Sequence, residues 1–507
     1  MTYPIAELAG IVDPEGYFQP GPEPGEDTMR RWSTDLKCAI AEIRKKTIDI
    51  NRMYDYYYGD HPQVWLTDKI RSMFKALADQ MPENYCGVAI DAPLRRLRVT
   101  GFTSLVNAEE TAQVDENAPT QAMSVDDIAV QAEWAKNRLD RKQKSVYRSA
   151  MVAGEGYLFV WPSDEGGYDI TYNDARLVHW HTTDGEVDHV AKVWLDESEA
   201  RWRAWILYDS GDSIRLRGIN QIKSGASRTD IPEAGKFEVD PDDPGGPHGF
   251  DRVPVFRFAE DEETRCSRLK SLTPQQDKIN KLESNKMVAA EFGAFKQRAY
   301  LTTQAIDKES VKQEPDHAIH LHPGGDSELG EAPTSIFEFS ATDLSNYDNT
   351  KQTEINAFFT IANLPRHLMI NPGASPSGAA ITADEGPFVE LILDMHEWIG
   401  ATWRELWGML GYDVEPTWKN PKTDDDQATA NTVKTMTDAG VPVDLAVRKY
   451  ANWDGDEIDQ LQASLETKAQ ADANRQQAMI QALDQGRGVA APGQSQPPNP
   501  NEPPASV

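Results

Sequence analysis

Cysteine is scarce in this sequence of 507 residues, and long apolar runs are missing. Its three cysteines, Cys38, Cys86 and Cys266, lie far apart and form no Cys-x-x-Cys pair, which fits a reduced compartment and gives no structural zinc site. The first residues lack a basic region followed by an apolar run, unlike a secretory signal. No stretch approaches the roughly 18 apolar residues of a membrane helix. We therefore expect an intracellular chain with no membrane partner.

Basic residues are also in short supply. Against 82 Asp and Glu there are only 51 Lys and Arg, a formal net charge of −31. Such a chain does not bind a nucleic-acid backbone by neutralising phosphates, because its net charge repels them. An acidic surplus can serve solubility alone, or it can form a surface that DNA passes without sticking. Composition does not choose between the two.

The motifs of common enzymes are absent. Gly235-Lys236 is followed by Phe237 instead of Ser or Thr, which excludes a phosphate-binding loop of the ATPase type. Gly154-Glu155-Gly156 leads into a strand-like segment and lacks the later glycine of a dinucleotide site. The Ser-rich segment near residue 375 is no nucleophile elbow, because its second glycine is misplaced. We predict no catalytic residue and no cofactor.

One pair of histidines has the spacing of metal ligands. His179 and His181 alternate on a predicted strand, so both imidazoles lie on one face, with Asp184 or Asp188 nearby. This spacing can bind a metal ion, but two alternating residues on a solvated strand face explain it equally well. Our prediction is that the chain has no metal site.

The chain is organised around a helix, a loop and a second helix. The first helix is predicted over Thr342 to about Asn363, and the second over Ile381 to Gly411. Gly386-Pro387 inside the second helix predicts a kink, or a helix that begins at Pro387. Between the helices lies a segment of small residues and prolines that cannot continue a helix. This candidate loop consists of Asn371, Pro372, Gly373, Ala374, Ser375, Pro376, Ser377 and Gly378.

Elsewhere, helical patterns surround a region of strand patterns. Further predicted helices run from Glu26 to about Gly59, over Glu83–Leu94 with an interruption at Pro93, over 127–153, and over 273–300. From Gly156 the apolar period changes to two, and short runs separated by turn signals predict an antiparallel β region up to about residue 258. The fold class is thus α+β, mainly helical.

Several segments, in this order, resemble the portal proteins of tailed double-stranded-DNA bacteriophages, in particular those of actinobacteriophage type. The resemblance covers about residues 27–485. The segments are Asn51–His61, Asn84–Phe102, His248–Phe256, the helix from Leu272, Ile361–Leu368 and Ser375–Ala380. Each is weak alone, and their order carries the resemblance. The acidic stretch 107–126 and both tails depart from the family pattern.

The resemblance implies a ring-forming portal fold with a wing, a two-helix stem, a small α/β clip and a C-terminal helical crown. The implied divisions are a flexible arm (1–26), the wing (27–271), stem helix 1 (272–300), the clip (301–341), stem helix 2 (342–363), the tunnel loop (364–380), a long kinked helix with wing return (381–423), the crown (424–486) and a disordered tail (487–507).

The resemblance also implies a function and partners. A portal ring, usually a dodecamer, forms the channel at one capsid vertex through which DNA is packaged and ejected. Implied partners are other copies of the chain, double-stranded DNA, the large terminase subunit, the head-tail adaptor, and the major capsid and scaffolding proteins. The implied location is the virion, after synthesis in the host bacterial cytoplasm. The alternatives are another head-assembly or adaptor protein and, less favoured, a glycan-binding hydrolase.

Overall fold

A computed structural model describes residues 23–62, 83–104, 125–163, 166–221, 231–294, 298–301, 319–321, 335–338, 343–369, 378–422 and 426–439, with single positions 443, 447, 464, 467 and 475. The chain divides into two units, Met1–Lys422 and Thr423–Val507. Several predictions lie outside the described residues: most of the N-terminal arm, the loop residues 371–377, most of the crown and the tail.

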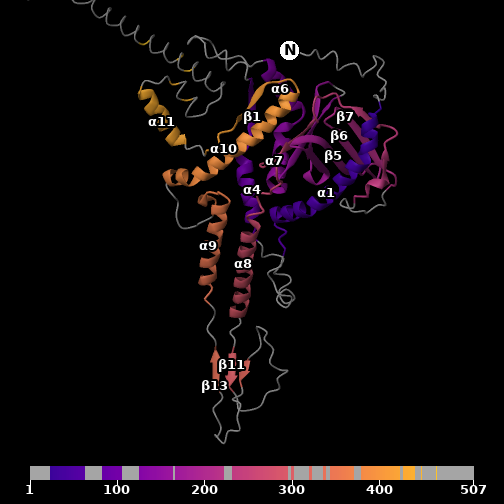
Figure 1. The fold of residues 1–507 in the computed structure, drawn as a ribbon. Coiled ribbons are helices and arrows are strands. Elements are labelled where there is room, and N and C mark those ends of the chain that lie inside the picture. The colour runs from indigo at the N-terminus through magenta and orange to yellow at the C-terminus, as the bar shows by residue number, and fades with distance from the viewer. Residues whose placement is uncertain are drawn as a thin grey trace, which may run out of the picture. The chain divides into compact units, whose positions relative to one another are not determined.

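The helices of the first unit include both long helices of the predicted helix–loop–helix. In chain order they are α1 (Glu26–Tyr58), α4 (Tyr85–Arg96), α6 (Val125–Lys136), α7 (Leu139–Ala153), α8 (Thr273–Ala294), α9 (Ser345–Ile361) and α10 (Gly378–Met409), with short 3₁₀ turns η3 (Ala175–Leu177), η4 (Ala234–Lys236) and η6 (Arg366–Leu368) (Figure 1). The second unit contains α11 (Asp426–Asp438). None of the helices described is long and apolar enough to cross a bilayer.

The strands in the described part of the chain form four sheets. In chain order they are β1 (Val99–Ser104), β2 (Gly156–Pro162), β3 (Tyr168–Asn173), β4 (Val178–Thr183), β5 (Glu186–Asp196), β6 (Arg201–Tyr208), β7 (Asp212–Gly218), β8 (Phe237–Val239), β9 (Gly245–Pro247), β10 (Val255–Phe258), β11 (Arg298–Leu301), β12 (Ile319–Leu321), β13 (Ser335–Glu338) and β14 (Val414–Trp418). The largest sheet has the order β4-β5-β6-β7-β8, with β9 also paired to β7, and all its pairs are antiparallel. The predicted antiparallel β region is confirmed.

The other three sheets are small. β10, β2 and β3 form one, with β10 at its edge as Pro254 predicts, and β1 pairs with β14. In the third, β11 pairs in parallel with β12 and antiparallel with β13. The described chain is therefore a mixed α/β structure.

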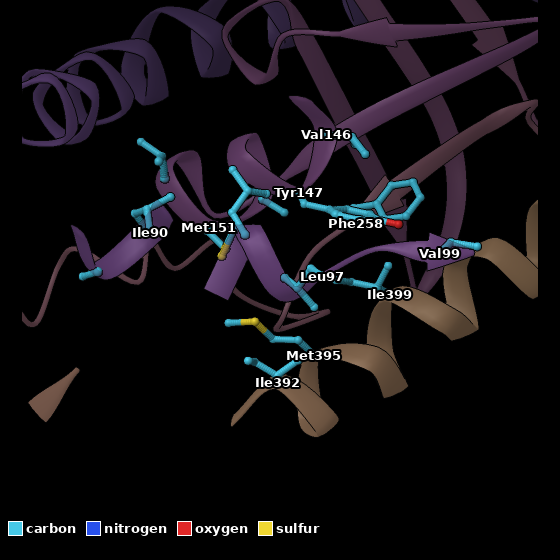
Figure 2. Close-up of a cluster of buried hydrophobic side chains, with 14 of the residues drawn as sticks. Ile90, Leu97, Val99, Val146, Tyr147, Met151, Phe258, Ile392, Met395 and Ile399 are labelled. Carbon is cyan, nitrogen blue, oxygen red and sulfur yellow. The ribbon is translucent and has the colours of Figure 1, made fainter. Parts of the chain in front are cut away.

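The main hydrophobic core joins segments that are far apart in the sequence. Figure 2 shows Ile90 of α4 and Met151 of α7 near Ile392, Met395 and Ile399 of α10. Tyr147 and Phe258 complete the centre of this cluster, in which the Tyr147 hydroxyl accepts a hydrogen bond of 2.7 Å from the indole N–H of Trp403. Because α10 contributes so many buried residues, the helix that follows the loop is fixed to the rest of the first unit.

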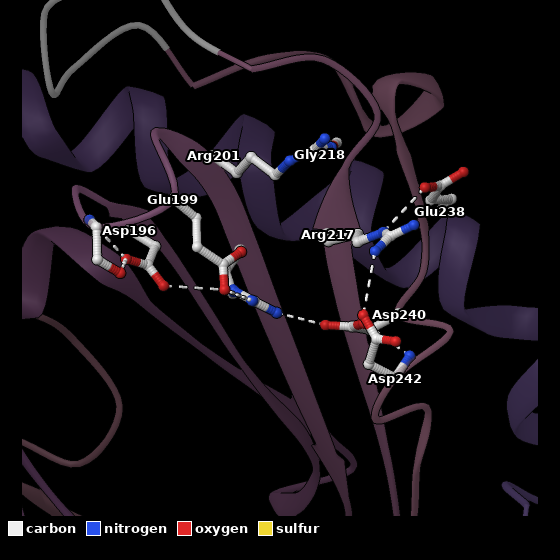
Figure 3. Close-up of polar contacts among 10 residues, drawn as sticks. Asp196, Glu199, Arg201, Arg217, Gly218, Glu238, Asp240 and Asp242 are labelled. Atoms are coloured by element: carbon white, nitrogen blue, oxygen red, sulfur yellow. Dashed lines mark hydrogen bonds and ion pairs between the residues drawn. The ribbon is translucent and has the colours of Figure 1, made fainter.

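Arginines on the large sheet bind carboxylates from neighbouring strands (Figure 3). Arg203 of β6 contacts Asp196, Glu199 and the buried Asp240. Arg217 of β7 contacts Glu238 at 3.0 Å and Asp242 at 3.4 Å. These contacts join β5, β6 and β7 to the segment that leaves β8.

The structure corrects three element boundaries. The single helix predicted over 127–153 is broken at Asn137-Arg138, where Arg138 has φ 53° and the Asn137 side chain bonds to β3 through the carbonyl of Tyr168 and the N–H of Ile170. The helix predicted over Glu83–Leu94, with an interruption at Pro93, runs through Pro93 and ends at Arg96. The helix from Thr273 ends at Ala294, and Tyr300 belongs to β11.

Candidate functional site: the supports of the 370–377 segment

α8 and α9 lie side by side as an antiparallel pair that is joined mainly by polar contacts (Figure 1). Gln275 near the start of α8 donates to the backbone carbonyl of Glu354, and Lys286 farther along pairs with Asp348 at 2.6 Å. Residues later in α8 thus contact residues earlier in α9, as expected for antiparallel helices.

Lys351 of α9 is the most enclosed cation of this pair. Its ammonium group lies 2.6 Å from a carboxylate oxygen of Glu83 and 2.6 Å from one of Glu283, and its side chain is 13% exposed. Burial acts to lower the pKa of Lys351, but hydrogen bonds to Glu283 and Glu83 outweigh it and raise the pKa. Lys351 therefore stays charged and joins α9, α8 and the segment before α4.

A buried polar network fixes the first half of α8. The Gln276 side chain accepts from the N–H of Tyr85 and donates to Asn280, and Asn280 bonds to His61 at 2.9 Å. The Tyr56 hydroxyl donates to Asp277, and burial with this contact raises the pKa of Tyr56 to about 12. The fully buried side chains described on α8 are largely polar. Gln276 has partners at Glu83 and Tyr85, and Asn280 has its partner at His61, just after α1.

The end of α9 is defined by a left-handed residue. Asn363 has φ 53°, and the N–H of Leu364 donates to the carbonyl of Phe359 at 2.9 Å. The N–H of Asn363 donates to the carbonyl of Thr360, which completes a Schellman motif. Leu364 is buried, and Pro365 after it prevents further helix. The chain therefore leaves α9 in a fixed direction.

Both ends of the 370–377 segment meet at Asp384, in the second turn of α10. One oxygen of its carboxylate accepts from the backbone N–H of Arg366 at 2.5 Å and from that of His367 at 3.3 Å. The Asp384 side chain thus binds η6, which precedes the segment, to the helix that follows it. This arrangement is suited to hold a loop, and we assign no chemical step to it.

Glu385 lies beside Asp384 and carries a buried carboxylate. The Arg96 guanidinium of α4 contacts it at 3.0 Å, and His367 Nε2 lies 3.6 Å away. Arg96 also donates to the carbonyl of Pro421 and lies over the ring of Phe388. The Glu385 side chain in this ion pair is only 5% exposed. The Arg96–Glu385 pair connects the residues that hold the loop to the main hydrophobic core. Nothing in the sequence pattern singles out Asp384, Glu385 or Arg96, because their partners are distant along the chain.

The predicted loop residues 371–377 lie outside the described residues, and Gly378 is the first residue of α10. The alternative in which the helix begins at Pro387 is wrong, because Pro387 lies inside α10. The kink at Gly386-Pro387 stays a prediction. On the large sheet, His179 and His181 share a face with ring centroids 5.8 Å apart, and Asp184 occupies the turn after β4.

The family described as "Phage portal protein, SPP1 Gp6-like" matches residues 37–471. This chain belongs to that phage portal family. The family's members are structural proteins of the phage particle.

The portal chain is similar to a chain in "Virion of native gene transfer agent (GTA) particle", with 11% identity, TM-score 0.38, and coverage of 75% of this chain and 91% of that one. A chain in "Neck of empty GTA particle computed with C6 symmetry" gives 11% identity, TM-score 0.35, and coverage of 74% and 89%. No curated protein matches.

Proposed function

We propose that this portal-family chain forms a ring of identical subunits at one capsid vertex, and that double-stranded DNA is packaged and ejected through the ring. In this proposal the ring also docks the large terminase subunit and the head-tail adaptor, and contacts the major capsid and scaffolding proteins. The match to the portal family over residues 37–471 is the observation that carries the proposal.

The stem of the proposed ring is the α8–α9 pair. Two antiparallel helices joined by charged side chains, with few buried apolar residues of their own, suit a position where neighbouring copies cover the remaining faces. The wing would comprise α1 to β10, the clip the β11–β13 sheet, and the crown the unit that begins at Thr423.

The 371–378 segment is the proposed DNA-facing loop. Support for this role comes from its small residues and prolines and from the fixed ends that Asn363, Asp384 and the buried Glu385 provide. A loop with anchored ends can touch DNA without loosening the helices on either side. The net charge of −31 supports a lumen that repels phosphates, so that DNA slides instead of binding.

Electron microscopy of the purified full chain tests the proposal. We expect rings with an axial hole, seen along the axis as discrete rotational classes. A uniform monomer with hydrolytic activity would overturn the proposal in favour of an enzyme. Rings that bind the capsid only in the presence of a separate portal would instead point to a head-tail adaptor.

Replacement of Ser375-Pro376-Ser377 by bulky acidic residues tests the loop. We expect rings to form normally while DNA packaging or retention falls, because added bulk and charge narrow the channel. Alanine at the same three positions is the matched control and should package DNA nearly normally. If the acidic variant forms no rings, the segment has a structural role and the loop assignment is wrong.

A further inference from the structure

Three histidines and one aspartate meet on the β4–β5 hairpin of the large sheet. His181 lies directly opposite His189 in the strand pairing, and their ring centroids are 4.7 Å apart. His179 is two residues before His181 on the same face, with its ring 6.1 Å from that of His189. Asp188 precedes His189. The portal proposal gives these four side chains no role.

The contacts of His189 are those of a metal ligand. Its Nδ1 lies 2.7 Å from Oδ2 of Asp188, and a carboxylate can only accept, so Nδ1 carries the proton. In the neutral ring Nε2 then keeps a lone pair. Among the described residues this buried Nε2 has no hydrogen-bond partner, although His189 is only 2% exposed. An aspartate on one nitrogen and an open lone pair on the other is the usual state of a metal-binding histidine.

His179 repeats the same feature. Its Nε2 is also buried and finds no partner within the described part of the chain. Burying a polar atom without a hydrogen bond costs free energy. Two such nitrogen atoms lie on one sheet face, beside a third imidazole, so a compensating interaction is expected. A bound cation supplies one, because it pairs with the lone pairs directly.

We propose that His181 and His189 bind a divalent transition metal of the zinc class, with Asp188 orienting His189 and His179 as a further imidazole beside them. One potential ligand atom from each of His181, Asp188 and His189 lies within 4.8 Å of the others. Metal–nitrogen bonds of about 2.0–2.1 Å place tetrahedral ligands about 3.4 Å apart, so small side-chain rotations close the site. The proposal is independent of ring assembly.

The donor set decides the class of metal. Imidazole nitrogens suit Zn²⁺, Co²⁺, Ni²⁺ and Cu²⁺, whereas Mg²⁺ and Ca²⁺ prefer oxygen ligands. Asp188 also accepts a 2.6 Å contact from Arg31 of α1, which competes with direct metal binding through that oxygen. We therefore assign Asp188 chiefly a positioning role toward His189. A surface pocket lined by Arg31, Asp188 and Tyr208 lies beside this aspartate.

Titration of the tag-free, chelator-treated full chain with Co²⁺, followed by competition with Zn²⁺, tests the site. We expect about one Co²⁺ per chain with the visible absorption of a nitrogen-ligated ion, displaced by Zn²⁺. His181→Gln, on the edge strand β4, should weaken binding about ten-fold or more, and Asp188→Asn should weaken it roughly 10- to 100-fold. Both variants should keep the wild-type circular dichroism without metal.

His396→Gln is the matched control, because His396 lies on α10 against Trp418 and also has a buried Nε2 with no partner among the described residues. It should bind Co²⁺ like the wild type. The proposal is overturned if the wild type binds no Co²⁺ at micromolar concentration, or if His181→Gln and His396→Gln bind it equally. The comparison of His181→Gln with His396→Gln does not use the buried His189, so it still holds if a His189→Gln variant fails to fold.

Discussion

At the residue scale, a single left-handed asparagine directs the chain out of α9. Asn363 has φ 53°, a conformation that asparagine and glycine tolerate and that β-branched residues do not. Asn363→Val should lower the free energy of unfolding by about 1–2 kcal/mol, since the strain of the left-handed region falls on its branched side chain. The urea midpoint of the purified protein measures this.

Asn363→Gly is the matched control for that strain. Glycine keeps the Schellman geometry, so this variant should unfold at the wild-type midpoint or slightly above it. Equal losses of stability in the Val and Gly variants would mean that the asparagine side chain matters for another reason, and that backbone conformation does not explain the residue.

The histidine cluster shows where prediction from sequence ends at this scale. The alternation of His179 and His181 is visible in the sequence, but His189 was missed. A regular hairpin through the Asp184-Gly185 turn would place His181 opposite Asp188 and turn His189 to the other face. A register shift between His181 and Thr182 brings His189 opposite His181 instead. One-residue bulges of this kind leave no sequence pattern.

At the element scale, the α8–α9 pair depends on Lys351. Lys351→Met should lower the free energy of unfolding by about 2–3 kcal/mol, because it leaves the Glu83 and Glu283 carboxylates facing each other in a partly buried place. Chemical unfolding of the purified protein measures the loss.

Two further variants test whether burial of the Lys351 charge explains the loss of stability. Lys278→Met removes a 61% exposed lysine that is 3.9 Å from Glu354 on the same helix pair, and should cost no more than about 0.5 kcal/mol. Adding Glu283→Gln to Lys351→Met removes one of the two opposed charges and should recover part of the stability. If Lys278→Met costs as much as Lys351→Met, burial of the charge is not the cause.

The helices and strands were more predictable from the sequence than the contacts between them. Local signals placed the start of α8 at Thr273-Pro274 and the strands β6 and β7, because capping residues and period-two alternation act over a few neighbours. The break at Asn137 was missed, since both flanks are good helix formers and its cause is a contact with β3. The polar side chains buried on α8 have partners at His61, just after α1, and at Glu83, just before α4, which local patterns cannot show.

At the scale of the whole molecule, histidines buried in the neutral state make stability depend on pH. Burial lowers the pKa of His61 and His248 below the ordinary 6.5, and lowers that of His396 to about 4. At pH values between the ordinary pKa of 6.5 and the lower pKa of the folded state, the unfolded chain binds more protons than the folded chain. Stability therefore falls as pH falls. Their contribution is complete above about pH 6.5.

We therefore expect the unfolding temperature to fall steadily from pH 7 to pH 5, a range in which ordinary carboxylates stay ionised. His396→Gln should flatten this fall, because glutamine takes up no proton and the imidazole lies stacked on Trp418 with a ring distance of 4.2 Å. Cys38→Ser, at an exposed position on α1, should leave the slope unchanged. A slope that is the same in wild type and His396→Gln would exclude this histidine as a source of the pH dependence.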